Sequence, residues 1–117
     1  RSAEEGVLLE MIAVADDLER ALAARPADAA DTGWSQGVAL VAQRIRDSLA
    51  RFGIERVDPT GDPFDPRFHE AILEIDAPPG APPGSVVQVA QKGYRRGDRA
   101  LRAARVVVAR EPVEPGA

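Results

Sequence analysis

Four residues that could bind a metal or transfer protons lie close together in residues 58–72, DPTGDPFDPRFHEAI. They are Asp62, Asp65, His69 and Glu70, and carboxylates combined with imidazole are common zinc ligands. The spacing argues against such a site, because His69 is the only histidine and no His-x-x-x-His or Glu-x-x-His pattern occurs. Each aspartate precedes a proline, which favours extended backbone, and Asp65 suits the N-cap of a short turn that begins at Pro66. We therefore predict no metal and no cofactor.

Nucleophilic catalysis has no better support in the sequence. Ser35 and Ser48 lie outside any nucleophile-elbow motif, and no glycine-rich phosphate loop occurs. The chain has no cysteine, which excludes thiol chemistry and suits a cytoplasmic location. We expect no enzyme activity. The proline-rich segment is instead predicted to be a rigid connector, in which Phe64 and Phe68 are buried beside a hydrogen-bonded His69.

Seven basic residues and one acid occupy residues 92–110, whereas the first 34 residues hold eight acids and three bases. The bases are Lys92, Arg95, Arg96, Arg99, Arg102, Arg105 and Arg110. This basic stripe favours an anionic partner, either nucleic acid or an acidic protein surface. Its one aromatic residue, Tyr94, is fewer than single-strand binders usually place among their cations. The alternative is that the arginines only solvate the outer faces of strands.

Apolar residues recur at helical spacing in two segments that must position these charges. The first runs from Val7 to Leu22 and is ended by Pro26, and the second ends at Gly53, a typical left-handed helix stop. Two helices of this length do not enclose a core alone, so we predict a hairpin that pairs into a dimeric four-helix bundle. The predicted dimer interface is Leu8, Met11, Ile12, Ala15, Leu18, Leu22, Val38, Val41, Ile45 and Leu49. The alternative is that the hairpin packs on its own β-region.

After Phe52 the pattern changes to short β-branched or alternating runs. Four strands are predicted, at residues 54–57, 71–75, 86–90 and 104–109, separated by Pro/Gly turns such as DAPPGAPPG. The fold class is therefore predicted to be α+β. Its predicted parts are a helical dimerisation hairpin at residues 1–53, a small all-β domain at 54–112 and a tail at 113–117. No apolar run approaches the length of a membrane span.

The order of the motifs resembles the GrpE family of nucleotide exchange factors. The first helix ends in DDLERAL, and the second runs from Gly37 into RFGIERVDPTGDPFDPRFHEAI. The combination of FDPxxHEA with QKGYRRGDRALRAARVVVA extends the resemblance over nearly the whole chain. The family's long N-terminal paired helix is expected to be represented only by its end, Glu4 to Ala24.

The resemblance implies a homodimer whose β-domain binds the ATPase domain of a DnaK-type chaperone and promotes ADP release by stabilising the open cleft. It implies no catalytic residue and no cofactor. Carried over position by position, it implies partner contacts at Ala90, Gln91, Lys92, Gly93, Tyr94, Arg99 and Arg20. The alternative function is a dimeric nucleic-acid-binding adaptor that uses the basic stripe.

These residues are not expected to act alike. Arg99 is the first candidate, since its planar guanidinium suits a partner carboxylate. Gly93 is expected to serve turn geometry and Tyr94 packing. For Arg20 the alternative is a solvated helix face with a pairing to Asp16 or Asp17. Ala90 is smaller than the apolar residue of some family members, which implies a weaker contact at that position.

Overall fold

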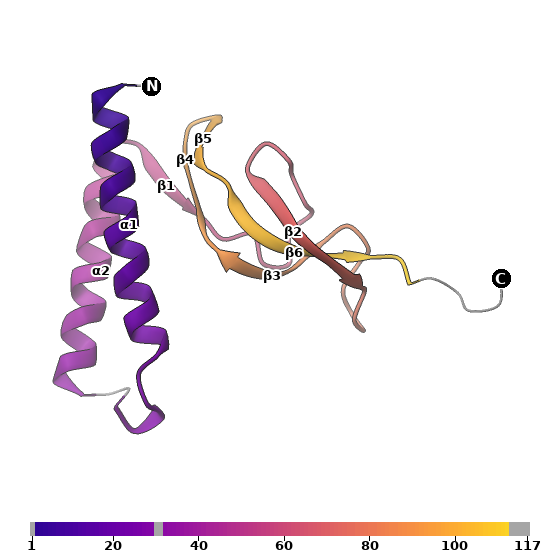
Figure 1. Ribbon diagram of the computed structural model, residues 1–117, viewed down its shortest axis with the longest axis horizontal. Helices are drawn as coiled ribbons and strands as arrows, with labels where there is room; N and C mark the ends of the chain where they lie inside the picture. The colour runs from indigo at the N-terminus through magenta and orange to yellow at the C-terminus, as the bar shows by residue number, and fades with distance from the viewer. Residues whose placement is uncertain (1, 30–31, 113–117) are drawn as a thin grey trace. The chain divides into compact units, whose positions relative to one another are not determined.

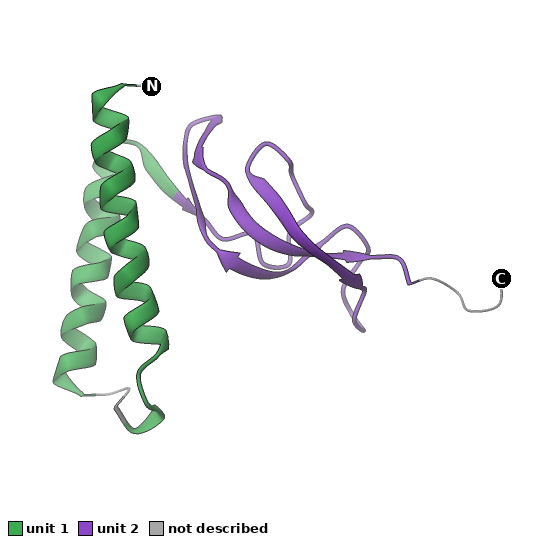
Figure 2. Ribbon diagram, viewed as in Figure 1, with its two compact units in different colours: residues 1–55 green, residues 56–117 purple. Residues whose placement is uncertain are grey.

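The computed structural model describes residues 2–29 and 32–112 (Figure 1). The chain consists of two compact units, residues 1–55 and 56–117, coloured green and purple in Figure 2. Two α-helices belong to the first unit, and strands β2 to β6 belong to the second. These elements confirm the expected α+β class. The predicted tail at 113–117 lies outside the described residues.

Two α-helices and a short 3-10 turn form the first unit. The bounds are α1 Ala3–Ala23, η1 Ala27–Ala29 and α2 Gly33–Arg51. α1 begins where the Ser2 side chain accepts a hydrogen bond from the Glu5 amide at 3.1 Å, and Thr32 caps α2 in the same way through the Ser35 amide at 3.2 Å. Gly53 has a φ of 77°, so the predicted left-handed stop after the second helix is confirmed.

α1 and α2 lie side by side as a hairpin (Figure 1). An ion pair between Arg46 Nη1 and Glu19 Oε1, 2.9 Å apart, joins them beside the apolar seam. The fully buried apolar residues of the two helices are Leu8, Ile12, Ala15, Ala42 and Leu49. Four of the ten residues of the predicted dimer interface, Leu8, Ile12, Ala15 and Leu49, are thus already buried within the chain.

Other apolar residues of the helices face solvent. Exposed fractions reach 62% for Val7, 50% for Val14, 71% for Leu40 and 51% for Val41. Burying such side chains would gain about 1.5–3 kcal/mol each. The hairpin thus covers one apolar seam and leaves further apolar surface open. Among the described residues, no helix combines the length and apolarity needed to cross a membrane.

In the described part of the chain, six strands form two three-stranded sheets. Their bounds are β1 Ile54–Val57, β2 His69–Asp76, β3 Val86–Gln91, β4 Gly93–Arg96, β5 Arg99–Arg102 and β6 Ala104–Arg110. One sheet has the order β1-β4-β5 and the other the order β2-β6-β3. β6 pairs in parallel with β2 and antiparallel with β3. The four strands predicted from the sequence are confirmed, with β2 beginning two residues earlier than expected.

The core of the second unit lies against the central strand β6. Its buried members are Val86, Ala104, Val106 and Val108, with Val57, Phe64 and Val89 packed against them. β6 is covered on both faces, since Val107 and Ala109 are buried as well. A strand buried on both faces takes a continuous apolar run, which explains the sequence Val106 to Ala109.

No strand was predicted within QKGYRRGDRALR, the segment that contains β4 and β5. The structure makes it a β-hairpin whose tip is Gly97 with a φ of 60° and Asp98. A two-residue Gly-Asp connection is a hairpin signal, but the five cations in this stretch hide the apolar alternation that marks a strand.

Candidate functional site

The connector at residues 58–69 is held by local hydrogen bonds. The Asp65 carbonyl accepts the amides of Phe68 at 3.0 Å and His69 at 2.8 Å, and its carboxylate accepts the Arg67 amide at 3.0 Å. The Asp65 amide donates to Nδ1 of His69 at 2.9 Å. The predicted capped turn after Asp65 and the hydrogen-bonded His69 are therefore confirmed. Phe68 is buried as expected, whereas Phe64 is half-buried and packs edge-on against the imidazole with the ring centroids 5.8 Å apart.

Two of the candidate metal ligands, Asp65 and Glu70, lie against arginines. Asp65 binds Arg67 through both carboxylate oxygens, with Nη2 to Oδ2 at 2.9 Å, and this hydrogen-bonded guanidinium lowers the pKa of Asp65. Glu70 lies 3.4 Å from Nε of Arg105. Within residues 2–29 and 32–112, no group of three or more His, Cys, Asp or Glu side chains is placed to hold a metal ion.

His69 makes the stability of this turn depend on pH. Burial lowers the pKa of His69, while the Asp65 and Asp62 carboxylates partly oppose the shift. As the pH falls below the unfolded value of about 6.5, the unfolded imidazole binds protons first. We therefore expect stability that is present above that pH and is lost as the pH falls through the lowered folded pKa. Protonated Nδ1 would also face the Asp65 amide, donor against donor.

The measurement is urea unfolding of wild type and His69→Asn between about pH 7.5 and 5.5. Asparagine keeps an acceptor for the Asp65 amide but does not titrate in this range. The wild type should lose stability over this window while the variant changes less. A wild type that becomes more stable toward the lower pH would contradict the lowered pKa.

The β4–β5 hairpin begins at Gly93, where the backbone approaches β6 closely. A Cβ added to Gly93 would lie 2.5 Å from the nitrogen of Ala104 and 2.7 Å from the carbonyl oxygen of Arg102. Gly93 does not have a positive φ, so the expectation that it serves turn geometry is wrong. Glycine is needed here because any side chain would collide with main-chain atoms.

Tyr94 anchors the base of the hairpin. It is 2% exposed, and the Arg102 guanidinium lies 5.5 Å from its ring centroid. Arg102 Nη2 also donates to the carbonyl oxygen of Lys92. The packing role expected for Tyr94 is therefore confirmed, and Arg102 serves as its cover.

Two arginines occupy opposite positions near the tip of the hairpin. Arg96 and Arg99 are cross-strand partners in register, and Arg99 is exposed. Like charges placed directly opposite each other destabilise a strand pair. The pairing of Arg96 with Arg99 therefore lowers the local stability of the hairpin, and it concentrates positive charge at one place on the surface.

Three other cations of the basic stripe, Lys92, Arg105 and Arg110, lie against acids elsewhere on the unit. Lys92 Nζ is 3.8 Å from Asp58, and Arg110 Nε is 3.0 Å from Asp76. Arg105 and Arg110 belong to β6, in a different sheet from the hairpin. The structure therefore divides the stripe into separate groups of charges.

The predicted contact residues fall in different elements. Ala90 and Gln91 end β3, and Ala90 is exposed. Gly93, Tyr94 and Arg99 belong to the hairpin, so the second unit brings most of the predicted set onto adjoining segments.

Arg20 belongs to the first unit. It lies near the end of α1 with a largely exposed side chain, and its guanidinium pairs with Asp17. This is the arrangement that the alternative for Arg20 described.

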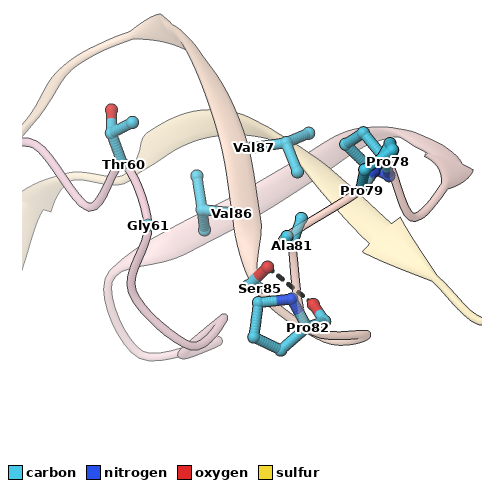
Figure 3. A pocket seen from close by; sticks show the side chains of 10 residues that line it. Thr60, Gly61, Pro78, Pro79, Ala81, Pro82, Ser85, Val86 and Val87 are labelled. Atoms are coloured by element: carbon cyan, nitrogen blue, oxygen red, sulfur yellow. Dashed lines mark hydrogen bonds between the residues drawn. The ribbon is translucent and has the colours of Figure 1, made fainter.

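An open pocket lies where the proline-rich turn between β2 and β3 meets residues 60–61 (Figure 3). Its volume is about 360 Å³, and its lining is Thr60, Gly61, Pro78, Pro79, Gly80, Ala81, Pro82, Ser85, Val86 and Val87. The Ser85 hydroxyl donates to the Pro82 carbonyl at 2.6 Å, drawn as a dashed line in Figure 3. The lining contains no titratable side chain, so it offers no acid, base or charged ligand for chemistry.

The sequence did not indicate that Arg67 and Arg95 stack on an aromatic ring. Both guanidiniums lie over the ring of Phe68, with Cζ atoms 5.2 Å and 4.9 Å from its centroid. The sequence could have indicated this only if β4 had been predicted as a strand. Successive side chains of a strand point to opposite faces, so Arg95 and Arg96 lie on opposite sides of β4.

The described residues form an α+β protein with a helical hairpin in one unit and a small β-unit in the other, and its candidate site is the cationic β4–β5 hairpin. The chain belongs to the GrpE family, whose model matches residues 1–110.

Relatives agree with this assignment. The chain is 41% identical over 104 residues to Protein GrpE of Alcanivorax borkumensis, which covers 88% of this chain and 54% of that protein. It is 43% identical over 111 residues to Protein GrpE of Rhizobium leguminosarum bv. trifolii, covering 90% and 52%. For Protein GrpE of Legionella pneumophila the identity is 40% over 104 residues, covering 89% and 51%. The chain thus spans about half the length of the curated relatives it matches.

Proposed function

We propose that this chain is a nucleotide exchange factor that binds the ATPase domain of a DnaK-type chaperone and promotes release of ADP. The observation that carries the proposal is membership of the GrpE family over residues 1–110. The cytoplasm, where such chaperones act, is the proposed location. The factor is proposed to change no covalent bond and to need no cofactor, so its residues act only by binding.

The proposed contact surface is the β4–β5 hairpin with the end of β3. Arg99 is its central residue, supported by its exposure and by the positive charge that Arg96 adds beside it. Ala90, Gln91 and Lys92 are proposed to contact the partner directly. Gly93 and Tyr94 hold the backbone that presents them, since one lies against main-chain atoms and the other is buried. Arg20 is proposed as a separate contact from the helical unit.

Exchange then follows from differential binding. A factor that binds the open cleft more tightly than the closed one shifts the ATPase toward the open state, and ADP leaves. Each 1.4 kcal/mol of preference changes the open-to-closed ratio by about tenfold. Because the coupling is reciprocal, rebinding of nucleotide weakens the affinity for the factor.

A nucleic-acid-binding adaptor is the weaker alternative. It requires a continuous cationic surface along residues 92–110, whereas Arg102 covers Tyr94 and Arg110 lies against Asp76. The comparisons with known proteins lend it no support.

The direct test is release of a fluorescent ADP analogue from a DnaK-type ATPase domain, measured against the concentration of this chain. We expect the release rate to rise and saturate, because a bound factor stabilises the open cleft. Binding to generic duplex DNA with a steep salt dependence, without any effect on ADP release, would favour the adaptor instead.

We also propose that the chain forms a homodimer through a four-helix bundle. The exposed Val7, Val14, Leu40 and Val41 support this, since apolar helix surface is stabilised when a second copy covers it. Half-buried residues from the predicted set would join them at the interface. These are Met11, Leu18, Leu22, Val38 and Ile45.

Sedimentation tests the dimer at about tens of micromolar protein. The wild type should sediment as a dimer, and Val41→Glu should shift it toward monomer, because a charge would have to be buried in the bundle. The matched control is Ile72→Glu, which places the same charge at an exposed apolar residue of β2 and should leave the dimer intact. A monomeric wild type would contradict the bundle.

A further inference from the structure

Arg95 is one of the seven bases of the basic stripe, and neither the resemblance nor the charge pattern distinguished it from the others. Its guanidinium stacks on Phe68 with Cζ 4.9 Å from the ring centroid, within the range of a cation–π contact. Phe68 is 6% exposed, so the ring is a fixed platform and not a mobile surface side chain. The described part of the chain gives Arg95 this stack and no ion pair.

The other arginine on this ring is held differently. Arg67 lies 5.2 Å from the Phe68 centroid, but the Asp65 carboxylate binds its guanidinium at 2.9 Å. Arg67 and Phe68 both belong to the capped turn after Asp65, so their contact is local. Arg95 comes from β4, and its stack therefore joins the hairpin to the connector turn.

Strand alternation links this stack to the surface that carries Arg99. Successive side chains of a strand point to opposite faces, so Arg95 and Arg96 lie on opposite sides of β4. Arg96 is the cross-strand partner of Arg99. Holding Arg95 down on Phe68 therefore holds Arg96 and Arg99 on the face that points away from the platform.

The stack of Arg95 on Phe68 stabilises the hairpin in the half nearer its tip. Its strands are four residues each, and its base is anchored by buried Tyr94 beneath Arg102. Beyond Arg95 toward the tip lie the opposed Arg96 and Arg99 and the turn at Gly97 and Asp98. Two like charges opposite each other weaken a strand pair, and the Arg95 stack adds an attraction at the adjacent position.

We propose that Arg95 is a positioning residue, whose stack on Phe68 fixes the β4–β5 hairpin in the pose that presents Arg99 to the partner. This deepens the proposed function and rests on it for the partner's identity. The hold on the hairpin itself does not depend on any partner.

Amide hydrogen exchange of the hairpin tests the hold without a chaperone. Arg95→Ala should speed exchange of amides in residues 95–102 by about two- to thirtyfold, which corresponds to the strength of a cation–π contact. Arg96→Ala is the matched control, because it removes the same charge from the same strand on the other face. Exchange in this control should stay unchanged or slow down. Amides of β6 should be unaffected in both variants.

Two further variants separate stacking from charge. Arg95→Lys keeps the charge but loses the planar group, and Phe68→Leu keeps an apolar side chain but removes the ring. Both should speed hairpin exchange, and adding Arg95→Ala to Phe68→Leu should have little extra effect, since the two changes remove one contact. Fully additive effects, or unchanged exchange in Arg95→Ala, would overturn the proposal.

The partner measurement uses release of the fluorescent ADP analogue. Arg95→Ala should require a higher factor concentration for half-maximal release, and Arg95→Lys should not fully restore it. Faster hairpin exchange with unchanged release would overturn the positioning role. If the wild-type factor does not speed ADP release from the ATPase domain, the proposed function is wrong. The amide hydrogen exchange measurements then decide by themselves whether the Arg95 stack stabilises the hairpin.

Discussion

Replacing Gly93 by alanine is expected to lower the free energy of unfolding of the second unit by about 3 kcal/mol, the upper end of the usual cost of overpacking. The new Cβ would lie 2.5 Å from the nitrogen of Ala104 and 2.7 Å from the Arg102 oxygen, well inside van der Waals contact. Both atoms belong to the main chain, so no side-chain rotation relieves the clash. Either β4 moves away from β6 or the bend between β5 and β6 opens.

The measurement is urea unfolding, followed separately through amide signals of β6 and of α2. Gly37→Ala is the control, because a Cβ there meets nothing within 4 Å. In the middle of α2 this change should raise stability by about 0.5–1 kcal/mol, so the two glycines should respond with opposite signs. If Gly93→Ala is as stable as the wild type, β4 does not approach β6 as closely as described.

The second large effect is expected for partner binding by Arg99→Ala. When a charge-assisted pair is buried at an interface, truncating one side costs about 2–5 kcal/mol, which is roughly a thirtyfold or larger loss of affinity. At a wet rim the loss would be below about 1 kcal/mol. Folding should change by less than about 0.5 kcal/mol, because Arg99 is exposed and opposes another arginine.

The readout is ADP release against factor concentration, with the melting curve measured in parallel. Arg110→Ala is the charge-matched control, since Arg110 is also an exposed strand residue but pairs with Asp76 in the other sheet. Equal losses in the two variants would mean that only general basicity matters. If neither variant loses activity, the contact lies elsewhere, on the helices or on the apolar part of the β-unit.

Local chemistry made several features predictable from the sequence. Pro26 and Gly53 mark the C-terminal ends of the two helices. Proline cannot donate the next helical hydrogen bond, and glycine readily adopts the left-handed backbone conformation, so neither effect depends on contacts with distant residues. Asp65 capped its turn for the same reason, through bonds to residues two to four positions away. The four predicted strands were visible as short β-branched or alternating runs between Pro/Gly turns, and burial on both faces adds a continuous apolar run in β6.

Other features could not be predicted because they depend on contacts between residues distant in sequence. The apolar stripes of the helices indicated which side chains are stabilised by burial. They did not indicate how much apolar surface one chain buries by itself, and Leu8 and Leu49 are already buried within the hairpin. Strands β4 and β5 are polar and short, so pairing and not composition makes them strands.

The sequence by itself determined the α+β class, the C-terminal ends of the two helices and the family, because these rest on local backbone preferences and on motif order along the chain. Only the tertiary structure decided what Gly93 and Arg95 do. Gly93 is required by main-chain atoms of Arg102 and Ala104, and Arg95 takes its role from a ring 27 positions earlier in the chain. Both roles arise when separate segments meet, which is information that residue types and spacing do not contain.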